Sequence, residues 1–220
     1  MNLLKKPYLI AIDGPAGSGK GTIAKIISKK LNLNYLDSGA IYRVIALGAL
    51  QEKISLDNVM ELLVFIRKVN IEFIDGQTSL NQTNVSEQIR LEEVSKAASI
   101  IAKHPELRKE ILDFQRQFLY GAGLVAEGRD MTTVVFPNAD LKIYLDASVE
   151  ERAKRRYKQL IVKGKDVNII RLTNEIIDRD KQDKERKHSP LLKSADSIIL
   201  NTDHFNIDQV TKKILELISE

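Results

Sequence analysis

Residues 14–22, with the sequence GPAGSGKGT, constrain the fold of this chain more than any other stretch. They match the phosphate-binding loop pattern, in which a glycine and four further residues precede Gly-Lys. Residues 8–12 form an apolar run that indicates a buried strand, and residues 22–31 place apolar side chains on one helical face. The motif requires this setting, because the glycines let backbone N–H groups face an anion and the helix dipole adds positive potential.

The loop residues predict nucleotide binding. Lys20 would supply an ammonium group to the β- and γ-phosphates. The generic motif has Ser or Thr directly after the lysine to hold Mg²⁺, whereas here Gly21 comes before Thr22, so the motif leaves the protein ligand of the metal open. We expect the following residues to bind ATP: Gly14, Pro15, Ala16, Gly17, Ser18, Gly19, Lys20, Gly21 and Thr22.

Composition limits the class of protein. A chain of 220 residues with 43% apolar and 29% charged residues is typical of one globular domain, or of one domain with an insert. No apolar run reaches membrane-spanning length and no signal-peptide core is present, so we expect no membrane partner. The absence of cysteine excludes disulfides and thiolate metal sites, and together these features predict a cytoplasmic protein.

The charge is unevenly distributed. The chain carries a net charge of +4, but residues 151–187 hold 13 Lys/Arg and 7 Asp/Glu, a net charge of +6. Such a cluster could bind nucleic acid or a small polyanion, or could simply be a solvated helical face. The phosphate loop favours a nucleoside triphosphate.

Apolar strands alternate with amphipathic helices along most of the sequence, which predicts an α/β protein with a parallel sheet covered by helices on both faces. Residues 67–90 differ, because alternating residues followed by a turn signal indicate a small antiparallel insert. In parallel sheets ligands bind at the carboxyl ends of the strands. Polar residues fall at these predicted ends, namely Asp13, Asp37, Ser38, Arg129, Asp130 and Asp146.

Several motifs, taken together, make the chain resemble the bacterial cytidylate kinases, which belong to the nucleoside monophosphate kinases. They occur in the family's order and cover nearly the whole chain. The segments that carry the resemblance are GPAGSGKGT at 14–22, DSGAIYR at 37–43, EGRDMTTVVFP at 127–137, IYLDASVEERAKRR at 143–156 and RDKQDKER at 179–186.

The resemblance implies a P-loop kinase fold, with a parallel five-stranded sheet, helices on both faces, a small antiparallel β insert in the monophosphate-binding region and a helical lid. The expected organisation is a single domain over residues 1–220. Its parts are a core of residues 1–66, 91–150 and 190–220, a monophosphate-binding insert of about residues 67–90, and a lid and following basic helix of about residues 151–189.

The resemblance also implies an activity, the transfer of the γ-phosphate of ATP to CMP or dCMP with Mg²⁺. It implies ATP and CMP or dCMP as partners, and we expect a monomer that does not bind nucleic acid. The family's CMP-binding positions correspond to Ser38, Arg43, Ser99, Arg108, Arg129, Asp130, Arg179, Asp183 and Arg186. Its catalytic cations correspond to Lys20, Arg129, Arg152, Arg155 and Arg156.

Two positions depart from the family pattern. Glu127 stands where relatives often have Asp, and Thr132 replaces a common Gly, which would restrict the turn that follows strand residues 124–126. Two alternatives stay open. One is another small-molecule P-loop kinase with a UMP or AMP acceptor, and the other is a nucleotide-dependent nucleic-acid-binding module, although only 5% of the residues are aromatic.

Overall fold

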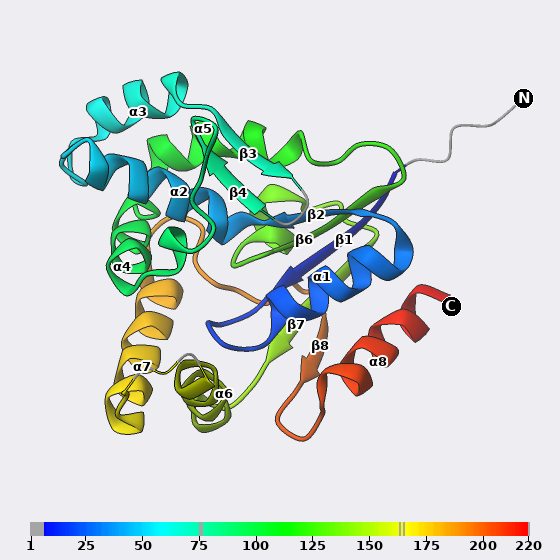
Figure 1. Ribbon diagram of the computed structural model, residues 1–220. Helices are drawn as coiled ribbons and strands as arrows, with labels where there is room; N and C mark the ends of the chain where they lie inside the picture. The colour runs from blue at the N-terminus through cyan, green and yellow to red at the C-terminus, as the bar shows by residue number, and fades with distance from the viewer. Residues whose placement is uncertain (1–6, 75–76, 163, 165, 220) are drawn as a thin grey trace, which may run out of the picture. The chain divides into compact units, whose positions relative to one another are not determined.

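The computed structural model of this chain describes residues 7–74, 77–162, 164 and 166–219 (Figure 1). Its contacts divide the chain into two compact units. We call Met1–Leu36 with Phe118–Glu220 the sheet unit, and Asp37–Gln117 the helical unit. Among the described residues, no helix is long and apolar enough to cross a bilayer.

The sheet unit contains the parallel sheet. Its strands are β1 (Tyr8–Asp13), β2 (Asn34–Asp37, of which the last residue falls in the helical unit), β6 (Gly123–Gly128), β7 (Leu141–Asp146) and β8 (Ile198–Asn201). Its helices are α1 (Lys20–Leu31), α6 (Val149–Val162), α7 (Ile169–Glu185) and α8 (Ile207–Ser219), with a π-helical turn η2 (Met131–Val135) after β6. The strand order is β2-β6-β1-β7-β8, so the predicted five-stranded sheet is confirmed.

The central strand β1 pairs in parallel with both β6 and β7. Asp13 lies opposite Gly128 in β6 and opposite Tyr144 in β7. The carboxyl ends of these strands therefore meet at one edge, where the loops that follow them can share a site.

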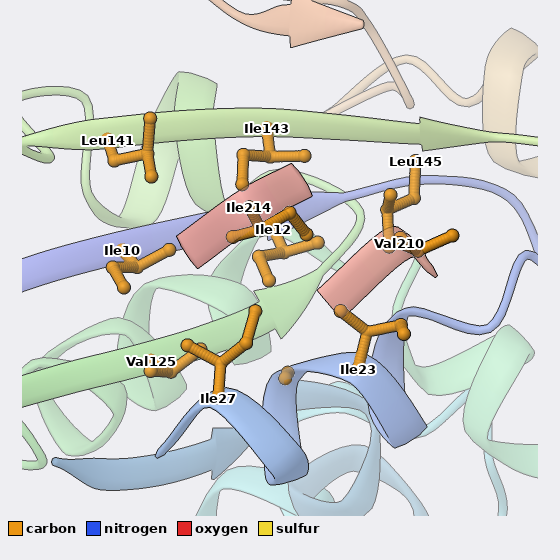
Figure 2. Packing of buried hydrophobic residues seen from close by; sticks show 11 residues of the cluster. Ile10, Ile12, Ile23, Ile27, Val125, Leu141, Ile143, Leu145, Val210 and Ile214 are labelled. Carbon is orange, nitrogen blue, oxygen red and sulfur yellow. The ribbon is translucent and has the colours of Figure 1, made fainter. Parts of the chain in front are cut away.

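A layer of apolar side chains holds helices α1 and α8 on the sheet. Ile10 and Ile12 of β1 are fully buried, as the continuous apolar sequence of a central parallel strand predicts. Figure 2 shows them between side chains of the neighbouring strands and of the two helices, including Ile23 of α1 and Ile214 of α8. Burial of these side chains fixes the helix that begins in the phosphate loop against the strand that ends in it.

The helical unit consists of helices and a small sheet. Its helices are α2 (Ser38–Gln51), α3 (Val59–Lys68), α4 (Glu92–Ile101) and α5 (Pro105–Arg116), with a 3₁₀ turn η1 (Gln88–Arg90). Its strands β3 (Ile71–Ile74), β4 (Gln77–Leu80) and β5 (Thr83–Asn84) pair antiparallel in that order, which confirms the predicted β insert. Gly48 lets α3 pack on α2, because a Cβ there would lie 2.3 Å from the Phe65 ring.

Candidate functional site

The phosphate loop joins β1 to α1 as the motif predicts. Gly17 and Gly19 have φ angles of 79° and 92°, a region that strongly favours glycine. Gly19 precedes α1 directly, and its carbonyl accepts the first bond of that helix, from the Ile23 amide at 3.1 Å. The loop thus ends at a helix N-terminus, where unbonded N–H groups favour an anion.

Lys20 is buried at the first position of α1. Its Nζ donates to the Pro15 carbonyl at 3.2 Å and lies 3.9 Å from Oε2 of Glu127, at the end of β6. Glu127 Oε1 faces α1 so closely that a Cβ on Gly21 would lie 3.0 Å from it. The glycine that interrupts the generic motif therefore sits where the Glu127 carboxylate approaches, while Thr22 is exposed.

Asp13, the last residue of β1, holds the turn that follows β6. Its Oδ1 accepts from the Met131 amide at 2.8 Å, and its Oδ2 accepts from the Thr132 amide at 2.8 Å and from the Thr132 hydroxyl at 2.7 Å. Burial raises the pKa of Asp13 to about 6, although the hydrogen bonds from Thr132 and Met131 oppose that rise. The Thr132 hydroxyl thus helps to hold this turn, in addition to any restriction of the backbone that comes from having Thr instead of Gly.

Four of the predicted acceptor-site residues gather around α7. Arg129 Nε donates to Asp183 Oδ2 at 2.7 Å, and Arg186 Nη1 lies 3.9 Å from Asp183 Oδ1. Burial alone would raise the pKa of Asp183, but the charges of Arg129, Arg179 and Arg186 outweigh it and hold that pKa below its usual value. Burial likewise opposes the charge on Arg129, yet the Asp183 carboxylate raises the pKa of Arg129 above its ordinary value.

The three predicted arginines of α6 differ from one another. The guanidinium of Arg152 is buried and bonded to the carbonyls of Ala16 and Ala147 and to Asp180. Arg155 donates to the carbonyl and hydroxyl of Thr202, at 2.6 and 3.0 Å. Only Arg156 is exposed. The sequence predicted three lid cations, and the structure engages two of them with protein groups.

In the helical unit, two predicted residues lie at the start of α2. Ser38 is buried, and its hydroxyl accepts from Gln115 Nε2 at 2.7 Å. Arg43 Nη2 donates to Asp37 Oδ2 at 2.9 Å, while Asp37 Oδ1 caps α2 through the Ala40 amide. Asp37 therefore orients the guanidinium and begins the helix at the same time.

The other two predicted residues of this unit lie on α4 and α5. The Ser99 hydroxyl donates to the Ser95 carbonyl of its own helix at 3.1 Å. Arg108 donates to the Ala102 carbonyl at 3.2 Å, and its guanidinium carbon lies 5.4 Å from the centre of the Tyr42 ring. A cation over an aromatic face holds the guanidinium in a fixed direction.

The structure thus brings the predicted residues together in two sets, one in each unit. The sheet unit holds the phosphate loop and Arg129, Asp130, Arg152, Arg155, Arg156, Arg179, Asp183 and Arg186. The helical unit holds Ser38, Arg43, Ser99 and Arg108.

Sequence reasoning missed two buried polar residues, each of which lies on the apolar face of a helix. Gln115 continues the buried series Leu107 and Ile111 on α5, and Asp180 continues Leu172 and Ile176 on α7. A polar residue in register with an apolar helix face is the signal that could have found both, since a buried polar group requires a partner.

Comparison with known proteins places the chain in a family. The sequence model described as cytidylate kinase matches residues 10–220. A protein named cytidylate kinase from Bacillus subtilis is 46% identical over 99% of this chain and 99% of its own length. One of the same name from Shewanella sediminis is 47% identical over 92% of this chain and 90% of its own length. With the motifs and the fold in agreement over nearly its whole length, this chain belongs to the cytidylate kinase family.

Proposed function

We propose that this chain transfers the γ-phosphate of ATP to CMP or dCMP, giving ADP and CDP or dCDP. The observation that carries the proposal lies in the sheet unit. There a phosphate loop and a cluster of three partly exposed arginines around Asp183 belong to one compact body. The loop suits a triphosphate, and guanidinium groups suit the phosphate of a nucleotide acceptor.

The donor side uses the loop of residues 14–22. Its N–H groups and the start of α1 bind the phosphates of ATP, and Lys20 exchanges its contacts with Pro15 and Glu127 for the β- and γ-phosphate oxygens. Of the three predicted α6 arginines, the exposed Arg156 can turn toward the triphosphate without breaking a buried contact.

The acceptor residues are the CMP-binding positions that the family resemblance implies. Arg43, Arg129 and Arg186 bind the α-phosphate of CMP, and Arg179 and Asp183 bind the ribose. Ser38, Ser99, Arg108 and Asp130 surround the base. Support comes from the fixed directions of several of these groups, because Asp37 orients Arg43 and the Tyr42 ring orients Arg108.

Mg²⁺ accompanies ATP, and the residues present fit it. Among the described residues, no group of three or more His, Cys, Asp or Glu could hold a metal. That agrees with a Mg²⁺ held chiefly by phosphates, by water and by one carboxylate. Glu127 would be that carboxylate, since it lies against the first turn of α1 beside Lys20. The ion would neutralise charge on the β- and γ-phosphates.

In the transfer, an oxygen of the CMP α-phosphate forms a bond to the γ-phosphorus, and the bond from that phosphorus to the β–γ bridging oxygen breaks. The bond electrons leave on the β-phosphate of ADP. The acceptor phosphate needs no general base, because it is largely deprotonated at neutral pH. The chain's part is therefore to align the two nucleotides and to surround the transferred group with Lys20 and guanidinium groups.

Asp130 supplies base selectivity. A carboxylate accepts from the amino group of cytosine and repels the carbonyl oxygen at the same position of uracil. The buried Asp130 sits at the start of η2, which Asp13 holds in place through Met131 and Thr132. We therefore expect CMP to be preferred to UMP.

The test is a coupled assay of ADP release with CMP, dCMP, UMP and AMP, for the wild-type chain and Asp130→Asn. CMP or dCMP should be the best acceptor, and Asp130→Asn should narrow the CMP-to-UMP ratio of kcat/KM about tenfold, mainly by losing CMP activity. A better acceptor among the other nucleotides would replace the proposal with another kinase activity. Salt-dependent nucleic-acid binding without CMP turnover would favour a nucleic-acid-binding module.

The monomeric state and the cytoplasmic location stay predictions, as does the division into a core, an insert and a lid.

A further inference from the structure

Arg152 contacts the backbone of the phosphate loop. Its Nη1 donates to the Ala16 carbonyl at 3.0 Å, and its Nε donates to the Ala147 carbonyl at 3.0 Å. Its Cβ supports the loop directly, because a Cβ on Gly17 would lie 3.2 Å from it. The Arg152 side chain is 3% exposed, so these contacts are made away from water.

The contact with Ala16 decides where a phosphate-binding amide points. In a trans peptide the C=O and the following N–H point in opposite directions. A donor that holds the Ala16 carbonyl therefore points the Gly17 N–H away from Arg152, which is the orientation in which this amide can face a bound phosphate. Glycine at 17 offers little resistance to a flipped peptide, so this orientation requires an external partner.

Asp180 of α7 fixes Arg152 in that position. Its two carboxylate oxygens accept from Nη1 and Nη2 of Arg152 at 3.0 and 2.6 Å, in the fork-to-fork geometry of a strong ion pair. Asp180 itself is buried. Together, Asp180 and the carbonyls of Ala16 and Ala147 bind both terminal nitrogens and Nε of the guanidinium. Arg152 therefore has little freedom to move away.

The same helix carries the acceptor-site residues. Asp180 follows Arg179 directly and precedes Asp183 by less than one turn, and Asp183 is bonded to Arg129 at 2.7 Å. Helix α7 is thus tied through Asp180 to the loop that binds the donor, and through Asp183 to the end of β6.

We propose that Arg152 and Asp180 form a positioning pair that orients the Gly17 amide of the phosphate loop and joins the loop to α7. The pair touches neither nucleotide, and its effect reaches ATP through the Ala16–Gly17 peptide. The inference rests on the proposed function and gives Arg152 a positioning role in place of direct contact with the phosphates.

The test measures ATP binding apart from catalysis. Asp180→Asn keeps the shape of the side chain but removes its charge and places an NH₂ group against the guanidinium. Arg152→Lys keeps a charge that can reach one carbonyl but cannot form the fork. In the full-length chain, titration calorimetry with a non-hydrolysable ATP analogue and Mg²⁺ should show about tenfold weaker binding for each variant, the effect of losing one charge-assisted hydrogen bond.

The double variant should bind the analogue no more weakly than the worse single variant, because the two residues act as one unit. The affinity for CMP alone should change less than the affinity for the analogue, since Asp183 keeps its own bond to Arg129. In ¹H–¹⁵N spectra of the ligand-free protein, the cross-peak of the Gly17 amide should change its chemical shift in both variants. A pair that only stabilised the fold would lower Tm without weakening ATP binding in the folded protein.

The matched control is Arg171→Gln, which removes an exposed ion pair with Glu175 on the same helix. Its ATP affinity, the chemical shift of its Gly17 amide and its turnover should equal those of the wild type. The proposal is overturned if folded Asp180→Asn and Arg152→Lys bind the analogue within twofold of the wild type, or if only CMP binding weakens. If Asp180→Asn does not fold, Arg152→Lys decides alone. A wild-type chain that does not phosphorylate CMP would instead contradict the proposed function, whatever the ATP affinities of the variants.

Discussion

Two hydrogen-bonded carboxylates in the sheet unit, the buried Asp13 and the partly buried Asp183, have pKa values that move in opposite directions. Asp13 at the end of β1 has neutral donors around it, and its pKa rises from 3.8 to about 6. Asp183 on α7 lies among Arg129, Arg179 and Arg186, and its pKa falls. Amide and hydroxyl donors compensate only part of the cost of burying a charge, whereas neighbouring cations exceed that cost. Asp13 thus holds backbone amides in place, whereas Asp183 holds charged side chains.

The largest expected effect comes from Asp183→Asn, which removes the charge that three arginines share. An amide cannot satisfy Arg129 and Arg186 together, so the guanidinium groups should repel one another and leave the proposed CMP phosphate site. We expect kcat/KM for CMP to fall about a thousandfold, equivalent to about 4 kcal/mol of transition-state binding. The measurement is steady-state kinetics with CMP varied at saturating ATP. A loss below tenfold would mean that the arginines do not depend on Asp183.

The next effect concerns pH and Asp13. Folding raises the pKa of Asp13, so the folded protein holds the proton more tightly than the unfolded chain does. Its contribution to stability is therefore complete below pH 3.8 and is lost as the pH rises through about 6. Asp183 behaves in the opposite way, because its lowered pKa gives a contribution that is present above pH 3.8 and is lost as the pH falls through the lowered value.

Urea unfolding of the wild type and Asp13→Asn at several pH values between about 4 and 8 isolates the first of these contributions, since other groups titrate alike in both proteins. The stability of the wild type relative to the variant should fall by about 2–3 kcal/mol across this range, the equivalent of two pKa units. A difference that is constant with pH would show that the pKa of Asp13 is not raised.

The smallest effect comes from Thr132→Val, which removes one of the three donors to Asp13 and keeps the side-chain shape. We expect a loss of about 1 kcal/mol in unfolding free energy at neutral pH, the net value of one hydrogen bond. The pKa of Asp13 should rise further, because a bond to its charged form is lost. Urea unfolding and the same pH series measure both changes. Thr132→Ser is the control, since it keeps the hydroxyl, and it should lie closer to the wild type.

The sequence alone determined the features that depend on short spacings and on the order of elements. Residues 14–22 predicted the loop between β1 and α1, and the alternation of strands and helices predicted the parallel sheet. Spacing also indicated that Arg179 and Asp183 share one face of α7, since residues four apart lie on one helical face, and Arg186 follows directly as the C-cap of that helix. These predictions hold because local backbone geometry and the register of apolar residues are largely fixed by neighbours in the chain.

Only the tertiary structure decided which partners the polar groups meet. Arg152 lies on the same helix as the exposed Arg156, yet it is buried, and its partners Ala16 and Asp180 are distant in sequence. Asp13 reaches Thr132 across 119 residues, and Ser38 meets Gln115 across 77. The type of a polar residue shows which groups it can bond to, but only its burial decides whether it needs a partner within the protein. Burial depends on how distant elements pack, and that information is not contained in the spacing of a motif.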